Sequence, residues 1–115
     1  MKKTKMLKKN YEFKKVLTKG KYFSGKYLEI FIKRSKNEEE KVNFLGIAIS
    51  VKLAKAVKRN YIKRLIREVY QKIENEIDLG YEIVILCKKK ADIDKIRYND
   101  VNIDMKSIFE KANIL

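Results

Sequence analysis

The chain contains no histidine, tryptophan or proline, and Cys87 is the only cysteine among its 115 residues. A single cysteine excludes a disulfide framework. The lack of histidine excludes a cysteine/histidine zinc site and any catalytic dyad or triad that depends on histidine. No apolar run reaches 18 residues, and no long apolar stretch follows the basic N-terminus, so neither a membrane span nor a signal peptide is expected. These absences predict a reduced, soluble, cytoplasmic protein.

Acidic residues are also few, and the charge is unevenly distributed. The sequence has 29 Lys and Arg against 15 Asp and Glu, a net charge of +14. Residues 1–36 hold 13 basic and 2 acidic residues, and residues 52–67 hold 7 basic residues and no acid. Segregated positive charge favours a polyanionic partner, either nucleic acid or an anionic membrane surface. A coding bias toward lysine would explain many of the 24 lysines, but it does not explain three arginines within nine residues: Arg59, Arg64 and Arg67.

Length and composition predict one globular domain over residues 1–115. Hydrophobic periodicity predicts a first helix capped by Asn10 and stopped by Gly20, strands over 27–34, 42–51 and 81–87, and a charged loop over 36–41. A second helix is expected over 54–77, and a third is expected to begin near Asn99 or Asp100. The third helix places five apolar residues on one face: Val101, Met105, Ile108, Phe109 and Ala112. This mixture predicts an α+β fold with helices packed against a single sheet.

The segment from Arg59 to Arg67 has the strongest functional pattern. At about 100° per residue, one arc of this helix contains the apolar side chains Ile62, Leu65, Ile66, Val69 and Ile73. A second arc, of about 140°, presents Arg59, Asn60, Lys63, Arg64 and Arg67 outward. An ordinary amphipathic helix is expected to carry both signs of charge on its outer face, whereas the first acid of this expected helix is Glu68. Guanidinium and ammonium groups in this arrangement favour phosphate binding.

Three further residues are candidates for contacts beyond phosphate. The Asn60 amide suits a base edge, a ribose hydroxyl or a hydrated metal ion, or else a bond to its own backbone. Phe13 and Phe31 lie near the basic segments, and aromatic rings stack on unpaired bases. Core packing is the alternative for each ring. The residues alone therefore predict an RNA-binding module.

The residues from Lys58 to Arg67 resemble the Arg-Asn-Arg signature of the bacterial ribonuclease P protein subunit. Residues 7–16 followed by Gly20, residues 46–57 and residues 81–85 are similar to other parts of that family, in the same order. The chain departs from the family pattern at Met6, Leu17, Val51, Ala54, Tyr61 and 86–88. On these matches the chain is identified as a member of the family.

The resemblance implies a single-domain α-β sandwich of order αβββαβα with a left-handed βαβ crossover, as in domain 2 of ribosomal protein S5. It implies a catalytic RNA subunit as partner and precursor tRNA as substrate, with no membrane and no protein partner required. The RNA and the substrate would hold Mg2+, and the holoenzyme would remove the 5′ leader, while the protein alone would be inactive. The implied RNA-binding residues are Arg59, Asn60, Lys63, Arg64, Arg67, Lys52 and Lys55. The implied leader cleft is lined by Phe13, Leu17 and Phe31.

Two other protein classes have a similar composition. A structural ribosomal protein, or a general RNA-binding protein, is also small, basic and α+β. A DNA-binding helix-turn-helix protein would need a second helix beside the basic one, whereas strands are expected to flank it here. No histidine and no clustered carboxylates accompany the basic segments, so the chain itself has no evident general base or metal cage. We therefore expect the chemistry to depend on an RNA partner.

Overall fold

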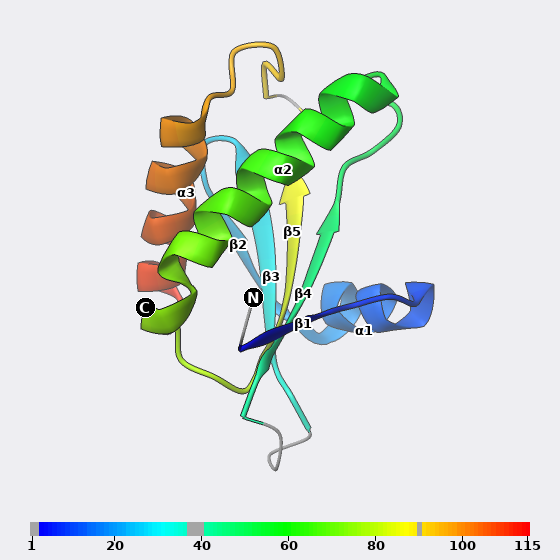
Figure 1. Cartoon of the computed structure of the whole chain (residues 1–115). Coiled ribbons are helices and arrows are strands. Elements are labelled where there is room, and N and C mark those ends of the chain that lie inside the picture. Colours follow the sequence, from blue (N-terminus) through cyan, green and yellow to red (C-terminus); the bar gives the residue numbers. More distant parts are fainter. Residues whose placement is uncertain (1–2, 37–40, 90) are drawn as a thin grey trace.

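The computed structural model describes residues 3–36, 41–89 and 91–115. In these ranges a five-stranded mixed sheet of order β1-β4-β5-β3-β2 packs between helices (Figure 1). The strands are β1 (Thr4–Met6), β2 (Lys21–Ser24), β3 (Leu28–Arg34), β4 (Asn43–Ala48) and β5 (Tyr81–Cys87). The helices are α1 (Asn10–Lys19), α2 (Ala56–Ile73) and α3 (Tyr98–Lys111), and a 3₁₀ turn, η1 (Glu74–Glu76), follows α2. From α1 onward the order is αβββαβα, which confirms the predicted fold class.

Alternating side chains give the sheet two different faces. On one face, Leu28, Ile30 and Ile32 of β3 are buried in the larger core, which also contains the apolar faces of α2 and α3. On the other face, Phe31 packs against a smaller cluster that includes Val16 of α1. None of the described helices is long and apolar enough to cross a membrane. The sheet thus has two helices on one side and only the short helix α1 on the other.

The connection from β4 to β5 is the unusual feature of the topology. These two strands are parallel neighbours, and α2 joins them. In Figure 1 the strands point upward, β5 lies to the left of β4, and α2 passes in front of the sheet. A connection that passes in front of upward strands while moving left is left-handed, opposite to the usual hand. The predicted left-handed crossover is therefore confirmed.

The N-terminal strand β1 was not predicted. It pairs in parallel with β4, with Thr4 opposite Asn43. The buried Thr4 hydroxyl also lies 2.9 Å from the hydroxyl of Tyr70, on α2. A three-residue strand with a lysine at its centre is too short to show an apolar periodicity, so the sequence does not reveal it. The contacts with β4 and α2 stabilise this strand instead.

The ends of several elements differ from the predictions. Lys9, not Asn10, precedes α1, and the Glu12 carboxylate accepts its backbone N–H at 2.9 Å. Gly20 ends α1 as predicted, donating its N–H to the Val16 carbonyl at 2.7 Å. The strand expected over 42–51 ends at Ala48, and the helix expected over 54–77 is α2 together with η1, because a turn over 50–53 separates strand from helix. Most of the charged loop expected over 36–41 lies outside the described residues.

Candidate nucleic-acid interface

Helix α2 carries the predicted basic segment on the side that faces away from the sheet. Its buried side chains are Ile62, Leu65, Ile66, Val69, Tyr70 and Ile73, which include all five predicted to pack inward. Asn60, Arg64 and Arg67 are exposed, whereas Arg59 and Lys63 are half-buried at the margin of the apolar stripe. The outward surface therefore consists of one amide and two guanidinium groups, with two further cations at its edge.

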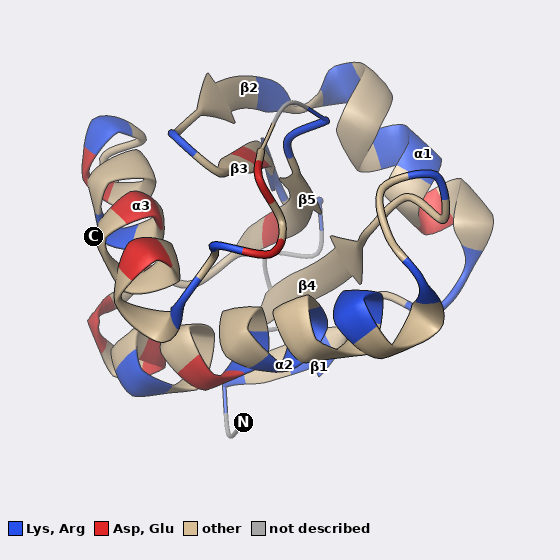
Figure 2. Ribbon diagram, turned by 90° about the horizontal axis from the view of Figure 1, so that it is seen from above, with Lys and Arg blue, Asp and Glu red and all other residues tan. Residues whose placement is uncertain are grey.

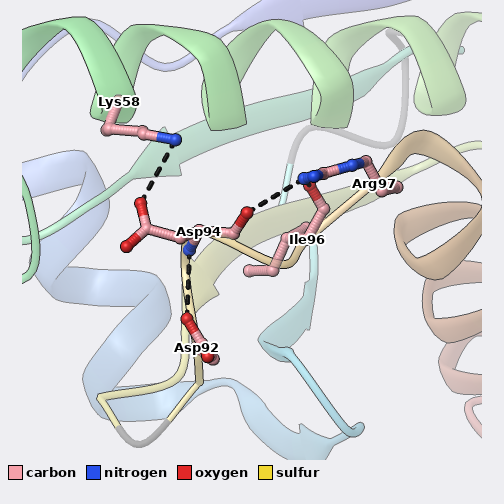
Figure 3. A network of polar contacts seen from close by, with 5 residues as sticks. All are labelled: Lys58, Asp92, Asp94, Ile96 and Arg97. Carbon is pink, nitrogen blue, oxygen red and sulfur yellow. Dashed lines mark hydrogen bonds and ion pairs between the residues drawn. The ribbon is translucent and has the colours of Figure 1, made fainter.

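The first turns of α2 are tied to neighbouring loops by two cations. Arg59 Nη1 donates to the carbonyl oxygen of Ala54 at 2.8 Å. Lys58 Nζ lies 3.2 Å from Asp94 Oδ1, in the loop between β5 and α3 (Figure 3). Arg97 holds the same loop by donating to the Asp94 carbonyl oxygen at 2.9 Å. Arg59 thus turns back toward the loop before the helix, which differs from the expectation that every cation of the signature points outward.

The remaining cations of this surface are more accessible. Arg64 Nε lies 3.5 Å from Glu68 Oε1, but both side chains are more than half exposed, at 73% and 52%. Such an exposed pair contributes little to stability, so a phosphate can replace the carboxylate at small cost. Arg67 makes no ion pair with a described residue. Lys52 and Lys55 are exposed before the helix and extend the basic surface toward the end of β4.

The second candidate surface lies between α1 and the sheet, on the face opposite α2. Phe13 and Phe31 are half-buried there and pack against the same small cluster. Gly46 of β4 provides the space, because a Cβ atom at this position would lie 2.6 Å from Phe13 Cε1. The Phe13 ring therefore rests directly on the β4 backbone. Leu17, the third residue implied for the cleft, is 37% exposed on α1.

Tyr22 is an aromatic residue of this face that the sequence analysis did not identify. It stands opposite Phe31 in the β2–β3 ladder, and the two ring centroids are 5.1 Å apart with an interplanar angle of 54°. The Tyr22 side chain is 48% exposed. Directly opposed residues of an antiparallel pair share one face, so the hairpin register would have revealed this contact. The open part of the sheet therefore has two adjacent rings.

Charge is segregated in space as well as in sequence. Figure 2 shows Lys and Arg on α1, on the N-terminal half of α2 and on the loop before it. Asp and Glu lie mainly on α3, on the loop before α3 and around the end of α2 and the turn η1 that follows it. Helix α1 and the start of α2, one from each basic segment, thus lie on the same side of the molecule in this view, although they pack on opposite faces of the sheet. A single polyanion can contact both of them.

The described residues do not fit a magnesium ion held by the protein alone. Within residues 3–36, 41–89 and 91–115, no three carboxylate, histidine or cysteine side chains are grouped as metal ligands. Two acids of the loop between β5 and α3 are each paired with a lysine, Asp94 with Lys58 and Asp92 with Lys95. Magnesium prefers several oxygen ligands in octahedral geometry, which this arrangement does not provide.

Cys87 lies at the end of β5 and is a buried free thiol. Burial raises the pKa of this thiol, and the negative charge of Glu29 raises the same pKa further. Because the thiolate is the reactive form, a raised pKa makes Cys87 a poor nucleophile at neutral pH. Its position therefore indicates a packing role.

Comparison with known proteins identifies the family and agrees with the fold. A family model described as Ribonuclease P matches residues 1–113. A ribonuclease P protein component of Clostridioides difficile is 36% identical over 112 residues, covering 96% of this chain and 94% of the relative. One from Fusobacterium nucleatum is also 36% identical, covering 95% and 97%. The 2.0 Å structure of the Staphylococcus aureus RNase P protein superposes with a TM-score of 0.81 at 28% identity, covering 95% of each chain. The chain therefore belongs to the ribonuclease P protein family.

Proposed function

We propose that this chain, a ribonuclease P protein subunit that works with an RNA partner in tRNA processing, holds two RNA elements at once. The basic face of α2 binds the phosphate backbone of a catalytic RNA subunit. The cleft between α1 and the sheet receives the single-stranded 5′ leader of precursor tRNA. The observation that carries the proposal is that α1 and the N-terminal half of α2, which border the two surfaces, both lie on the basic side of the molecule (Figure 2). One surface is rich in guanidinium groups, and the other contains aromatic rings.

The two surfaces suit different forms of RNA. Guanidinium groups bind phosphate oxygens regardless of sequence, which suits a folded RNA whose bases are paired. The binding residues we propose are Arg59, Asn60, Lys63, Arg64, Arg67, Lys52 and Lys55. Rings with open faces instead stack on unpaired bases, which a single-stranded leader offers. We propose Phe13, Leu17 and Phe31 as the residues that line the leader cleft.

The protein contributes position and charge rather than chemistry. We place Mg2+ on the RNA subunit and the substrate, because the described residues group no set of metal ligands. Binding the leader and the RNA subunit to one rigid sheet would fix the cleavage site relative to the catalytic RNA. The cations would lower the repulsion between two polyanions. We place this complex in the cytoplasm, and it requires no further protein.

The leader proposal is tested with the substitution Phe13→Leu. Leucine keeps apolar volume against Val16 and Val84 but removes the aromatic face, so folding is expected to survive with a loss below about 1.5 kcal/mol. Stacking is worth about 1–3 kcal/mol per base, so the mutant holoenzyme should bind precursor tRNA roughly fivefold to a hundredfold more weakly. Binding of mature tRNA, which lacks the leader, should not change. Both affinities are measured by titration of reconstituted holoenzyme.

The matched control is Tyr11→Leu, which removes a ring that is 66% exposed elsewhere on α1. This control should bind both tRNAs as the wild type does. An equal loss on both tRNAs with Phe13→Leu would show that Phe13 acts through the fold or the RNA subunit. No loss on either would leave Phe13 with a packing role only, and the leader proposal would fail for this residue.

The α2 proposal is tested with Arg67→Ala, because this side chain is exposed and makes no ion pair with a described residue. Affinity for the RNA subunit should fall while the melting temperature stays constant. Lys106→Ala removes the same charge from an exposed position on α3 and should change neither quantity. If the two variants weaken RNA binding equally, only total charge matters, and the specific role of the α2 face is refuted.

A further inference from the structure

The carboxylate of Glu29 lies on the open face of the sheet, where positive charge and apolar side chains otherwise prevail. Residues 1–36 contain only two acids, and the other, Glu12, accepts hydrogen bonds at the start of α1. Glu29 is two residues before Phe31 in β3, so the two side chains share one face of the sheet. Across the ladder Glu29 stands opposite Leu86 of β5. It therefore extends the row of side chains that begins with the rings of Phe31 and Tyr22.

Two neighbouring hollows meet at this side chain. The larger, of about 550 Å³, is lined by Tyr22, Lys26, Glu29, Lys88, Lys89 and Ala91. The smaller, of about 280 Å³, shares Glu29 and Lys89 and continues over Ala48 and Leu86 toward the loop before α2. Three lysines, the Glu29 carboxylate and the Tyr22 ring thus line one hollow. This arrangement combines an aromatic face, a negative acceptor and mobile positive charge.

The Glu29 carboxylate is held in place but keeps free acceptor capacity. The Tyr22 hydroxyl donates to Glu29 Oε2 at 2.7 Å, and the Tyr22 ring packs on Phe31. Among the described residues, no other hydrogen bond or ion pair reaches the carboxylate. An ionised carboxylate has about four lone-pair sites, so both oxygens can accept further bonds. The side chain is thus fixed in orientation and ready for an external donor.

A carboxylate in this position discriminates between the chemical groups of a single-stranded RNA. It repels phosphates and accepts hydrogen bonds only from base N–H groups or ribose hydroxyls. Guanine alone among the four bases presents two adjacent donors on its Watson–Crick edge, N1–H and the N2 amino group, which match the two carboxylate oxygens. Adenine and cytosine offer one amino group each, and uracil offers one N–H.

We propose that Glu29 is a specificity-determining residue that favours guanine at one position of the RNA strand in the cleft. The base stacks on Tyr22 and donates to the two Glu29 oxygens, while Lys26, Lys88 and Lys89 contact the flanking phosphates. This inference rests on the proposed binding of the leader in the same cleft. A good bidentate contact is expected to discriminate between bases by roughly fivefold to a hundredfold.

The test uses reconstituted holoenzyme and a pool of precursor tRNAs with randomised leaders, whose relative kcat/KM values are measured by sequencing. Wild type should show a preference for guanine at one leader position. Glu29→Gln, which keeps an acceptor for the Tyr22 hydroxyl but replaces one oxygen by a donor, should abolish that preference and no other. Inosine, which lacks the N2 amino group, should lose most of the guanine advantage with wild type and nothing with Glu29→Gln.

Glu110→Gln is the matched control, because it makes the same charge change at an exposed position on α3. It should leave every base preference unchanged. The inference is refuted if wild type and Glu29→Gln have the same base preferences while precursor tRNA is still bound more tightly than mature tRNA. If the holoenzyme does not distinguish precursor from mature tRNA at all, the leader proposal itself fails, and this inference fails with it.

Discussion

Relative to its size, the Asp104 side chain is the one whose removal should lower the free energy of unfolding most. It lies in the middle of α3, is only 7% exposed, and accepts three backbone N–H groups of the β2–β3 turn. The donors are Lys26, Tyr27 and Leu28, at 2.7, 2.9 and 2.8 Å. A methyl group at Gly25 would overlap this carboxylate. One side chain of α3 therefore fixes the hairpin that carries Tyr22 and Glu29.

The expected cost of Asp104→Ala follows from the three donors that it would leave unpaired. The Leu28 N–H is buried, and leaving it without a partner costs about 1–3 kcal/mol. The Lys26 and Tyr27 N–H groups are only partly buried, so water can replace the carboxylate at about 0.5–1.5 kcal/mol each. We therefore expect a loss of roughly 2–6 kcal/mol in the free energy of unfolding. This is a large share of the roughly 5–15 kcal/mol typical of small proteins.

The assay is equilibrium unfolding in urea, monitored by circular dichroism. Asp104→Asn keeps one oxygen acceptor and should lose about half as much as Asp104→Ala. Glu110→Ala, exposed on the same helix, should stay within about 0.5 kcal/mol of the wild type. Gly25→Ala displaces the same carboxylate, so its cost should shrink markedly in the Asp104→Ala background. A loss below about 1 kcal/mol for Asp104→Ala, or additive effects in the double mutant, would refute the reasoning.

Three further outcomes are expected. The isolated chain, stripped of nucleic acid, should not cleave precursor tRNA in a gel assay, and adding the RNA subunit and magnesium should produce the mature 5′ end; robust cleavage without RNA would contradict this. If about six to ten phosphates are neutralised, affinity for the RNA subunit should fall on the order of a thousandfold between 50 and 200 mM salt, whereas a flat titration would refute the electrostatic role of the basic segments. Because the pKa of Cys87 is raised, its thiol should react with a disulfide reagent at pH 8 more slowly in the native protein than in guanidinium chloride, and equal rates would show that it is accessible.

The sequence predicted those elements of the fold whose stability comes from a long apolar pattern. Strand β3 lies within its predicted range because its apolar and polar side chains alternate. Strand β5 begins and ends at the predicted residues because a short, continuous apolar run is typical of a buried strand. Four of the five residues predicted for the apolar face of α3 are buried, whereas the fifth, Ala112, follows the helix and is half-buried. Strand β1 was missed because its partners, Asn43 and Tyr70, are distant in the sequence. Tertiary contacts of this kind leave no local pattern.

The same distinction applies to the candidate site. The basic arc of α2 was predicted from helical spacing, but the hydrogen bond that turns Arg59 toward Ala54 depends on the loop conformation. Tyr22 and Asp104 were not recognised, because their roles depend on the strand register and on the packing of α3 against the hairpin. The sequence therefore identifies candidate functional residues that lie together on a single helix or strand. It does not show which residues of different helices and strands contact one another.

The start of α2 shows how binding and stability conflict in this chain. The first turn of the helix contains no acid, although a helix N-terminus is stabilised by negative charge and destabilised by positive charge. Lys55, Lys58 and Arg59 all lie there, and only Asp94 and the Ala54 carbonyl oxygen partly compensate them within the described structure. A helix selected for stability alone would carry Asp or Glu at these positions. A phosphate backbone lying against this turn would supply the missing negative charge, so the arrangement that weakens the free protein is the one that strengthens its complex with RNA.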